Sequence, residues 1–181
     1  MFRVAEHEYD ITSANIEIFA NDAEQLIGWG VKIIGKSQGA ADDIAMWNPA
    51  IIAEALLETK PGQVSHWHEI AGRTIAWDEP DEDPQALFEV FETEAIYKCQ
   101  WQFLKGQDGG GVRLLLEGMV DVDVDHEGLP IYVDTKLGIA PWPMRFRSEQ
   151  ECLDRYKQFG FKDPVKFEVI NRISSLVFLN Q

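Results

Sequence analysis

Apolar and polar side chains alternate in two segments of this chain, and that alternation constrains the fold more than any other feature. One segment covers residues 95–103 and the other covers residues 119–125. The apolar positions are Tyr97, Cys99, Trp101 and Phe103 in the first segment and Val120, Val122 and Val124 in the second. A period of two places such a set on one face of a β-strand. We predict two neighbouring antiparallel strands with these side chains facing inward, joined through the glycine-rich turn at residues 106–111.

Glycines and turn residues locate most of the other strands. A helix across Gly28, Gly30 and Gly35 would lose about 1 kcal/mol at each glycine, so the segment that contains them is expected to be a strand. Asn21 and Asp22 mark a turn before it, which predicts a hairpin with the preceding segment. The expected strands cover residues 9–19, 24–39, 63–77, 95–104, 112–124 and 129–139, and residues 165–179 form a strand pair or one long strand.

Capping signals predict two helices. Asn48 can cap a helix that has Pro49 at its first position. Ser148 and Glu151 have the spacing of a capping box. Residues 84–94 fit either a helix or a strand. The expected helices cover residues 48–59 and 148–160.

The chain has the length and composition of one globular domain. It has 181 residues, of which 45% are hydrophobic and 26% charged. We expect a single α+β domain over residues 1–181, mostly antiparallel β-sheet, sandwich- or barrel-like, with about two helices. Cys99 and Cys152 are too few for a disulfide framework. With no membrane-length apolar run and no apolar leader, a soluble cytoplasmic protein is expected.

Negative charge dominates the chain and limits its partners. The formal net charge is −15: residues 1–144 hold 26 acids and 9 Lys/Arg, a net of −17, and residues 145–181 hold 5 acids and 7 Lys/Arg, a net of +2. Such a surface repels nucleic acid and anionic lipid and favours basic partners. We therefore expect a binding domain without catalysis whose acids in residues 78–94 and 117–134 meet a basic protein. An immunity protein that neutralises a basic toxin is one concrete example.

Two groups of side chains are the candidate binding residues. Asp121, Asp123 and Asp125 alternate with valines and are expected to form one solvated strand face. Trp142 lies between two prolines and is the tryptophan that we expect to be exposed and to touch a partner.

A second interpretation makes the chain an enzyme. The segments "GMVD" and "IYVDTK" place Asp121 before a turn and Asp134 and Lys136 at the end of an apolar strand. This pattern resembles the core of the PD-(D/E)XK nucleases of the RecB-like branch. The resemblance implies that both aspartates bind Mg²⁺ or Mn²⁺, that Lys136 is catalytic and that nucleic acid is the substrate. Whether the chain is an enzyme therefore stays open.

His66 and His68 are weak candidates for metal ligands. On a strand, both rings would share a face and could chelate a transition metal. The structural alternative is a pair of half-buried histidines that are hydrogen-bonded to the backbone or to carboxylates. Under the resemblance, either one could be an upstream ligand of the nuclease metal.

Overall fold

The structure is a computed structural model. It describes residues 1–21, 25–39, 44–79, 86–90, 92–106, 111–122, 125–143, 148–170 and 173–179. All structural statements below refer to these residues. In chain order the elements are β1 (Phe2–Val4), β2 (His7–Asn21), β3 (Leu26–Lys36), η1 (Ile44–Met46), β4 (Ala50–Thr59), η2 (Trp67–Ile70), β5 (Thr74–Trp77), β6 (Ala86–Glu89), β7 (Thr93–Ala95), β8 (Tyr97–Lys105), β9 (Val112–Val120), β10 (Leu129–Ile139), β11 (Trp142–Pro143), α1 (Glu149–Gln158), β12 (Val165–Ile170) and β13 (Ile173–Phe178).

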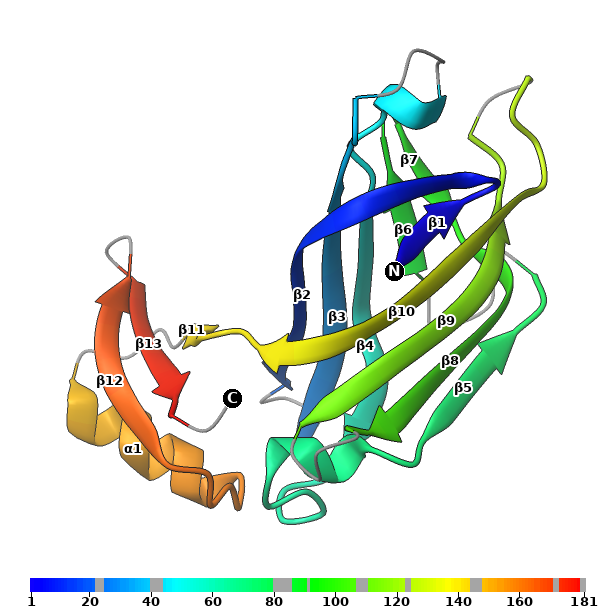
Figure 1. The fold of residues 1–181 in the computed structure, drawn as a ribbon. Helices are drawn as coiled ribbons and strands as arrows, with labels where there is room; N and C mark the ends of the chain where they lie inside the picture. The colour runs from blue at the N-terminus through cyan, green and yellow to red at the C-terminus, as the bar shows by residue number, and fades with distance from the viewer. Residues whose placement is uncertain are drawn as a thin grey trace.

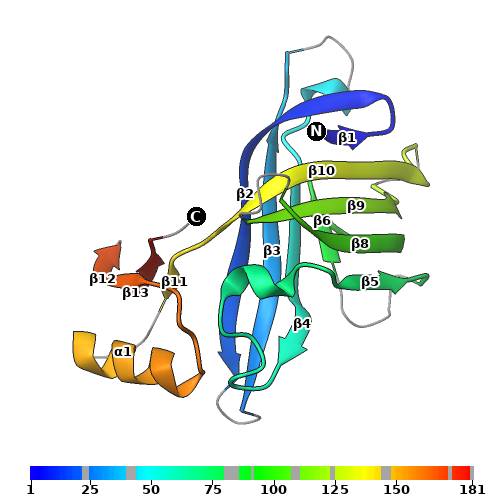
Figure 2. The ribbon, with the colours of Figure 1, turned by 60° about the horizontal axis from the view of Figure 1, so that its bottom comes forward.

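Ten of these strands form one sheet in the order β5-β8-β9-β10-β1-β2-β3-β4-β6-β7. Consecutive neighbours pair antiparallel, and β10 also meets β2 in a short parallel contact at Gly138↔Asn15. The sheet folds over at β10, β1 and β2. Figures 1 and 2 show that β10, β9, β8 and β5 cross in front of β2, β3 and β4 at a steep angle. The arrangement is that of two packed layers made from one continuous sheet.

The interior between the layers holds the apolar positions of the alternating strands. Cys99, Trp101 and Phe103 of β8 are all buried, as predicted. Tyr97, which was also expected to face inward, is only partly buried, because the β8–β9 register shifts between Tyr97 and Gln100. The Trp101 ring stacks on Trp77 of β5 with centroids 6.3 Å apart. Val120 at the end of β9 is also fully buried. The antiparallel β-rich architecture expected from the alternation is therefore confirmed.

The hairpins that turn signals predicted are also confirmed. β2 pairs with β3 from Asp10↔Lys36 to Asn21↔Leu26. β8 pairs with β9, and β10 pairs with β9 in register Leu129↔Val120. The ambiguous segment before residue 95 contains two short strands, β6 and β7.

The helix predicted at residues 48–59 is wrong, because this segment is strand β4. It pairs with β3 on one side and β6 on the other. Ala55 has φ +50°, and the β3–β4 register shifts between Trp29 and Val31. This bulge changes the phase of the strand, so that the buried positions include Ala53 and Leu56. Buried residues three apart imitate helical spacing, which explains the error. Of the two expected helices, the described residues contain only α1, besides two short 3₁₀ turns.

Residues 66–70 also differ from the strand that the sequence suggested. Trp67–Ile70 form the 3₁₀ turn η2, which His66 precedes, and only residues 74–77 of this segment are a strand, β5. The Ser65 N–H donates to Glu69 Oε2 at 2.8 Å, and the Trp67 N–H donates to Asp163 Oδ2 at 3.0 Å. Side-chain carboxylates thus satisfy backbone donors that a strand would have paired with a neighbour.

The C-terminal part forms a small second sheet with the helix α1 against it. The strand order is β11-β13-β12, so the last segment is a strand pair. The α1 helix confirms the predicted cap, since Ser148 Oγ accepts a hydrogen bond from the Glu151 N–H. Gly160 follows the helix with φ +86°, a conformation that suits glycine. No helix within the described ranges has the length and apolar character needed to cross a bilayer.

An aromatic cluster joins this C-terminal part to the large sheet. Trp142 contacts Phe159 and Phe161 with ring centroids 5.6 and 5.7 Å apart. Phe161 in turn meets Trp29 of β3 edge-on at 5.7 Å. The expectation that Trp142 is exposed is therefore wrong: it is only 3% exposed, because it packs between the helix and the sheet.

Candidate functional site

Exposed carboxylates gather at one end of the large sheet, the end at which β9 finishes and β10 begins. Four of the connections that meet there carry exposed acids: β1–β2, the residues that follow β5, β6–β7 and β9–β10. The β3–β4 connection joins them through Trp47, whose ring contacts His126 with centroids 5.4 Å apart. Within the described residues of the four acidic connections there are seven exposed acids and no Lys or Arg; one exposed base, Lys98 near the start of β8, adjoins them, since its N–H donates to the Asp78 carbonyl. We call this group the acidic end. Its members are Glu6, Asp78, Glu79, Glu92, Asp121, Asp125 and Glu127. In Figure 1 the β1–β2 and β9–β10 connections lie at the upper right.

The opposite end of the sheet carries a different charge. The described connections there contain Lys60, Arg73 and one acid, Glu69. The Lys162 N–H of the C-terminal part donates to the Ser65 carbonyl at this end. The C-terminal part also has a net charge of +2 over residues 145–181. The negative charge is therefore concentrated away from the C-terminal part.

Asp121 has a fixed position in the acidic end. Its Oδ1 accepts hydrogen bonds from the Tyr97 hydroxyl at 2.8 Å and from the Gly128 N–H at 2.6 Å. The bond to Asp121 also raises the pKa of Tyr97 above its ordinary value, because the carboxylate favours the protonated phenol. The Val122 N–H closes the turn on the His126 carbonyl at 2.9 Å. The turn is thus held by its own aspartate.

The expected strand face of three aspartates is only partly tested. β9 ends at Val120, so Asp121 and Asp125 lie in the turn rather than on a strand, which corrects that expectation. Both side chains are exposed. Asp123 and Val124 lie outside the described residues. Val122 is partly buried against the core, as an inward-facing valine would be.

Asp134 of β10 is held by an arginine. Arg113 donates from Nε to Asp134 Oδ1 at 2.6 Å and from its second nitrogen to Oδ2, which makes a two-pronged ion pair. This pairing lowers the pKa of Asp134 below its ordinary value. The carbonyl of Asp134 accepts a bond from the terminal amino group of Met1. The carboxylate therefore serves to join β9 and β10.

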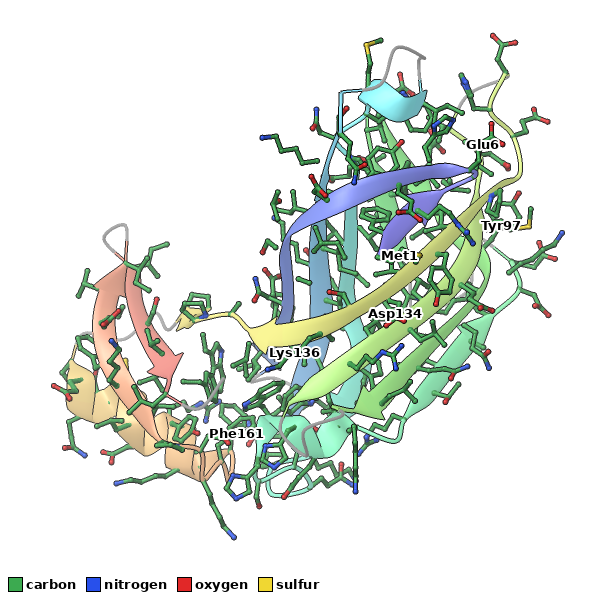
Figure 3. All side chains as sticks on the ribbon, viewed as in Figure 1. Met1, Glu6, Tyr97, Asp134, Lys136 and Phe161 are labelled. Carbon is green, nitrogen blue, oxygen red and sulfur yellow. The ribbon has the colours of Figure 1, made fainter. Side chains whose placement is uncertain are left out.

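The residues of the nuclease pattern do not come together. Asp134 lies opposite Leu115, whereas Asp121 follows Val120, five residues further along β9. Asp121 is therefore six residues beyond the position opposite Asp134, which at about 3.4 Å per residue separates the two Cα atoms by about 20 Å along the strand direction. Tyr97, the partner of Asp121, and Lys136 lie at different parts of the sheet in Figure 3. Asp121, Asp134 and Lys136 thus share no position at which one metal ion could bind.

His66 and His68 lie at the junction of the large sheet and the C-terminal part. Their rings are stacked, with centroids 5.4 Å apart and an interplanar angle of 18°. His66 Nδ1 lies 3.1 Å from Oδ1 of the buried Asp163. His66 therefore matches the structural alternative, a half-buried histidine paired with a carboxylate. In the described part of the chain, no three His, Cys, Asp or Glu side chains are grouped so that they could hold a metal ion.

Two features of these sites were not predicted from the sequence. Asp163 contacts His66 and Trp67 across almost a hundred residues, and no local pattern around Asp163 announces that contact. Glu6 joins the acidic end only because β1 pairs with β10 and β2. The acids at residues 78–94 and 117–134 were expected to form one surface; of the described ones, Asp78, Glu79, Glu92, Asp121, Asp125 and Glu127 lie at the acidic end, whereas Asp134 lies further along β10.

Comparisons with protein-family models, with curated proteins and with solved structures found no match to this chain.

Proposed function

We propose that the chain is a non-catalytic binding domain that recognises a basic protein through the acidic end. The observation that carries this proposal is the composition of four connections distant in sequence. Their described residues present seven exposed carboxylates and no Lys or Arg. Scattered surface acids would normally be interspersed with bases, so this segregation suits a cationic partner.

The electrostatics favour a protein partner over nucleic acid. A net charge of −15 repels phosphate backbones and attracts Lys/Arg-rich surfaces. Asp121 supports the proposal because Tyr97 and Gly128 hold its turn in one conformation. A carboxylate that is already ordered loses less conformational entropy on binding than a mobile one. An immunity-type protein, which covers the basic site of a toxin, is one form of such a domain.

The test uses a synthetic Lys/Arg-rich peptide as the probe and isothermal titration calorimetry as the measurement. The variant combines Glu6→Gln, Glu92→Gln and Glu127→Gln, which neutralise three exposed acids on three connections. The control combines three other exposed acids, Glu54→Gln, Glu58→Gln and Asp154→Asn. Both proteins lose the same net charge, so any difference between them reports position rather than total charge.

We expect the peptide to bind the control like the unmodified chain and to bind the acidic-end variant at least about tenfold more weakly, the equivalent of about 1.4 kcal/mol. Binding should also weaken steeply with salt, because exposed charges are screened within about 8–10 Å. Equal losses in both triple variants would contradict the proposal. So would Mn²⁺-dependent DNA cleavage that disappears in Asp134→Ala and in Lys136→Ala.

A further inference from the structure

Strand β12 is an open edge of the small sheet. It is the outer strand of the order β11-β13-β12, and Figures 1 and 2 show it at the margin of the molecule. None of its six residues is buried. An exposed edge strand presents unpaired backbone groups to which another strand can add.

The backbone groups of every second β12 residue point toward this open edge. The Leu179 N–H donates to the Pro164 carbonyl at 2.9 Å, so Pro164 faces β13. Because hydrogen-bonded positions alternate in an antiparallel pair, Lys166 and Glu168 also bond to β13. Their neighbours therefore direct N–H and C=O outward. The outward residues are Val165, Phe167 and Val169.

The small sheet carries exposed apolar side chains. Val169 of β12 is 63% exposed, and Ile173 at the start of β13 and Leu179 just after β13 are exposed as well. These three are half of the six large hydrophobic residues that are exposed in the described chain. An apolar, hydrogen-bond-competent edge of this kind favours strand addition from a partner.

We propose that β12 pairs antiparallel with β12 of a second copy of this chain, around a two-fold axis at Phe167. A two-fold axis perpendicular to the sheet keeps each face on its own side, so residues opposite one another must be an even number apart. With Phe167 opposite its own copy, Lys166 lies opposite Glu168 of the other chain. The outward groups of Val165 and Val169 also meet as a hydrogen-bonding pair.

Charge selects this register over its neighbours. Shifting the axis to Lys166 would place that lysine opposite its own copy, and shifting it to Glu168 would do the same for the glutamate. Within one chain, Lys166 Nζ already lies 2.5 Å from Glu168 Oε1. In the proposed dimer, Lys166 of each chain faces Glu168 of the other chain, so that opposite charges meet across the two β12 strands.

The overall charge distribution favours this contact over contacts through the rest of the surface. Residues 1–144 hold a net −17, so two copies repel each other over most of their surface. Residues 145–181, which include β12, hold a net +2. Two short strands bury much less surface than the about 1,600 Å² that a stable complex buries. The dimer is therefore reversible, and its fraction rises with protein concentration.

The test is sedimentation velocity over a range of protein concentration, with charge-reversal variants of β12. In a Lys166→Glu dimer, glutamates would face glutamates, and in a Glu168→Lys dimer, lysines would face lysines. A mixture of the two variants restores opposite charges at both positions. The control Lys157→Glu makes the same charge change as Lys166→Glu at an exposed position of α1.

We expect dimers from the unmodified chain and from Lys157→Glu, monomers from each β12 variant alone, and dimers again from the equimolar mixture. Recovery in the mixture also demonstrates that both variants are folded. Three outcomes would overturn the proposal: a monomer at every concentration of the unmodified chain, dimers that persist in both β12 variants, or no recovery on mixing. This test does not involve the acidic end, so its result is independent of the proposed partner.

Discussion

Asp163 is the side chain whose removal should most clearly loosen the C-terminal part. Its Oδ2 accepts the Trp67 N–H at 3.0 Å, and its Oδ1 lies 3.1 Å from His66 Nδ1. The carboxylate is buried, and both partners belong to the segment that connects β4 to β5. Two backbone bonds run in parallel with it, from Gly62 to Phe159 and from Lys162 to Ser65. Asp163 therefore reinforces one junction between distant parts of the chain.

The cost of Asp163→Ala follows from the groups it leaves behind. A buried N–H that loses a charged acceptor costs about 1.5–3 kcal/mol, which applies to Trp67. The His66 side chain is 37% exposed, so its pairing adds at most about 0.5 kcal/mol after screening by solvent. The Tyr156 hydroxyl bonds the main-chain carbonyl of Asp163, which the substitution leaves in place. We expect unfolding to become easier by about 2–3 kcal/mol.

The assay is urea denaturation followed by tryptophan fluorescence, with thermal unfolding as a second measurement. The midpoint temperature should fall by about 5–10 °C for a chain of this size. Asp163→Asn keeps an oxygen that can accept the Trp67 N–H, so it should lose less than half as much stability. Asp154→Ala, an exposed acid on α1, is the control and should stay within about 0.5 kcal/mol of the unmodified chain. A loss below about 0.5 kcal/mol for Asp163→Ala, or equal losses for Ala and Asn, would refute this reasoning.

Three further changes test the packing and the ion pairs. Gly118→Ala should cost about 1–3 kcal/mol in urea denaturation, because the added Cβ would lie 2.8 Å from the Cβ of Cys99; an unchanged midpoint would contradict this. Burial raises the pKa of the Cys99 thiol to about 11, and the Cys152 thiol is also buried with a raised pKa. A thiol reagent at neutral pH should therefore label both cysteines slowly in the folded chain and rapidly in denaturant. Fast labelling of the folded chain would contradict the burial of the two thiols. Asp134→Asn should lower stability at pH 7, where the pairing of Asp134 with Arg113 is intact. Because the folded pKa of Asp134 is lowered, its contribution to stability is present above the ordinary carboxyl range and is lost as the pH falls through the folded pKa. The stabilities of the unmodified and variant chains should therefore converge at acid pH, which denaturation curves at neutral and acid pH can measure.

Much of the sheet could be predicted because the side chains of a strand alternate between its two faces, and this alternation is visible in a short stretch of sequence. Alternation identified β8, and a glycine-rich segment identified β3. Of the second alternating segment, residues 119–125, only Met119 and Val120 belong to β9. The helix α1 was predictable from Ser148 and Glu151 for the same reason, since a cap is a contact between near neighbours. In β4 the local sequence pattern wrongly indicated a helix, because the bulge at Ala55 shifted the buried positions into helical spacing.

The candidate sites were less predictable because their contacts join distant segments. No local pattern indicated that Asp163 would contact His66 or that Trp142 would be enclosed by Phe159 and Phe161. One error could have been avoided by counting. Asp134 lies six residues beyond the turn that ends at Gly128, and a hairpin places such a residue far from its opening end.

The acidic end and strand β12 place the two proposed contacts on parts of the molecule with different charge. Mutual repulsion among the carboxylates at one end of the sheet opposes folding, whereas Asp121 of this group holds its own turn through the bonds described above. The large core offsets that repulsion, because buried side chains, rather than the connections, hold β8, β9 and β10 in place. The net +2 of residues 145–181 leaves β12 as a region where two copies can meet without that repulsion. A dimer formed there would carry two acidic ends, and a partner with two basic surfaces would bind it more tightly than a monomer, since the second contact becomes intramolecular.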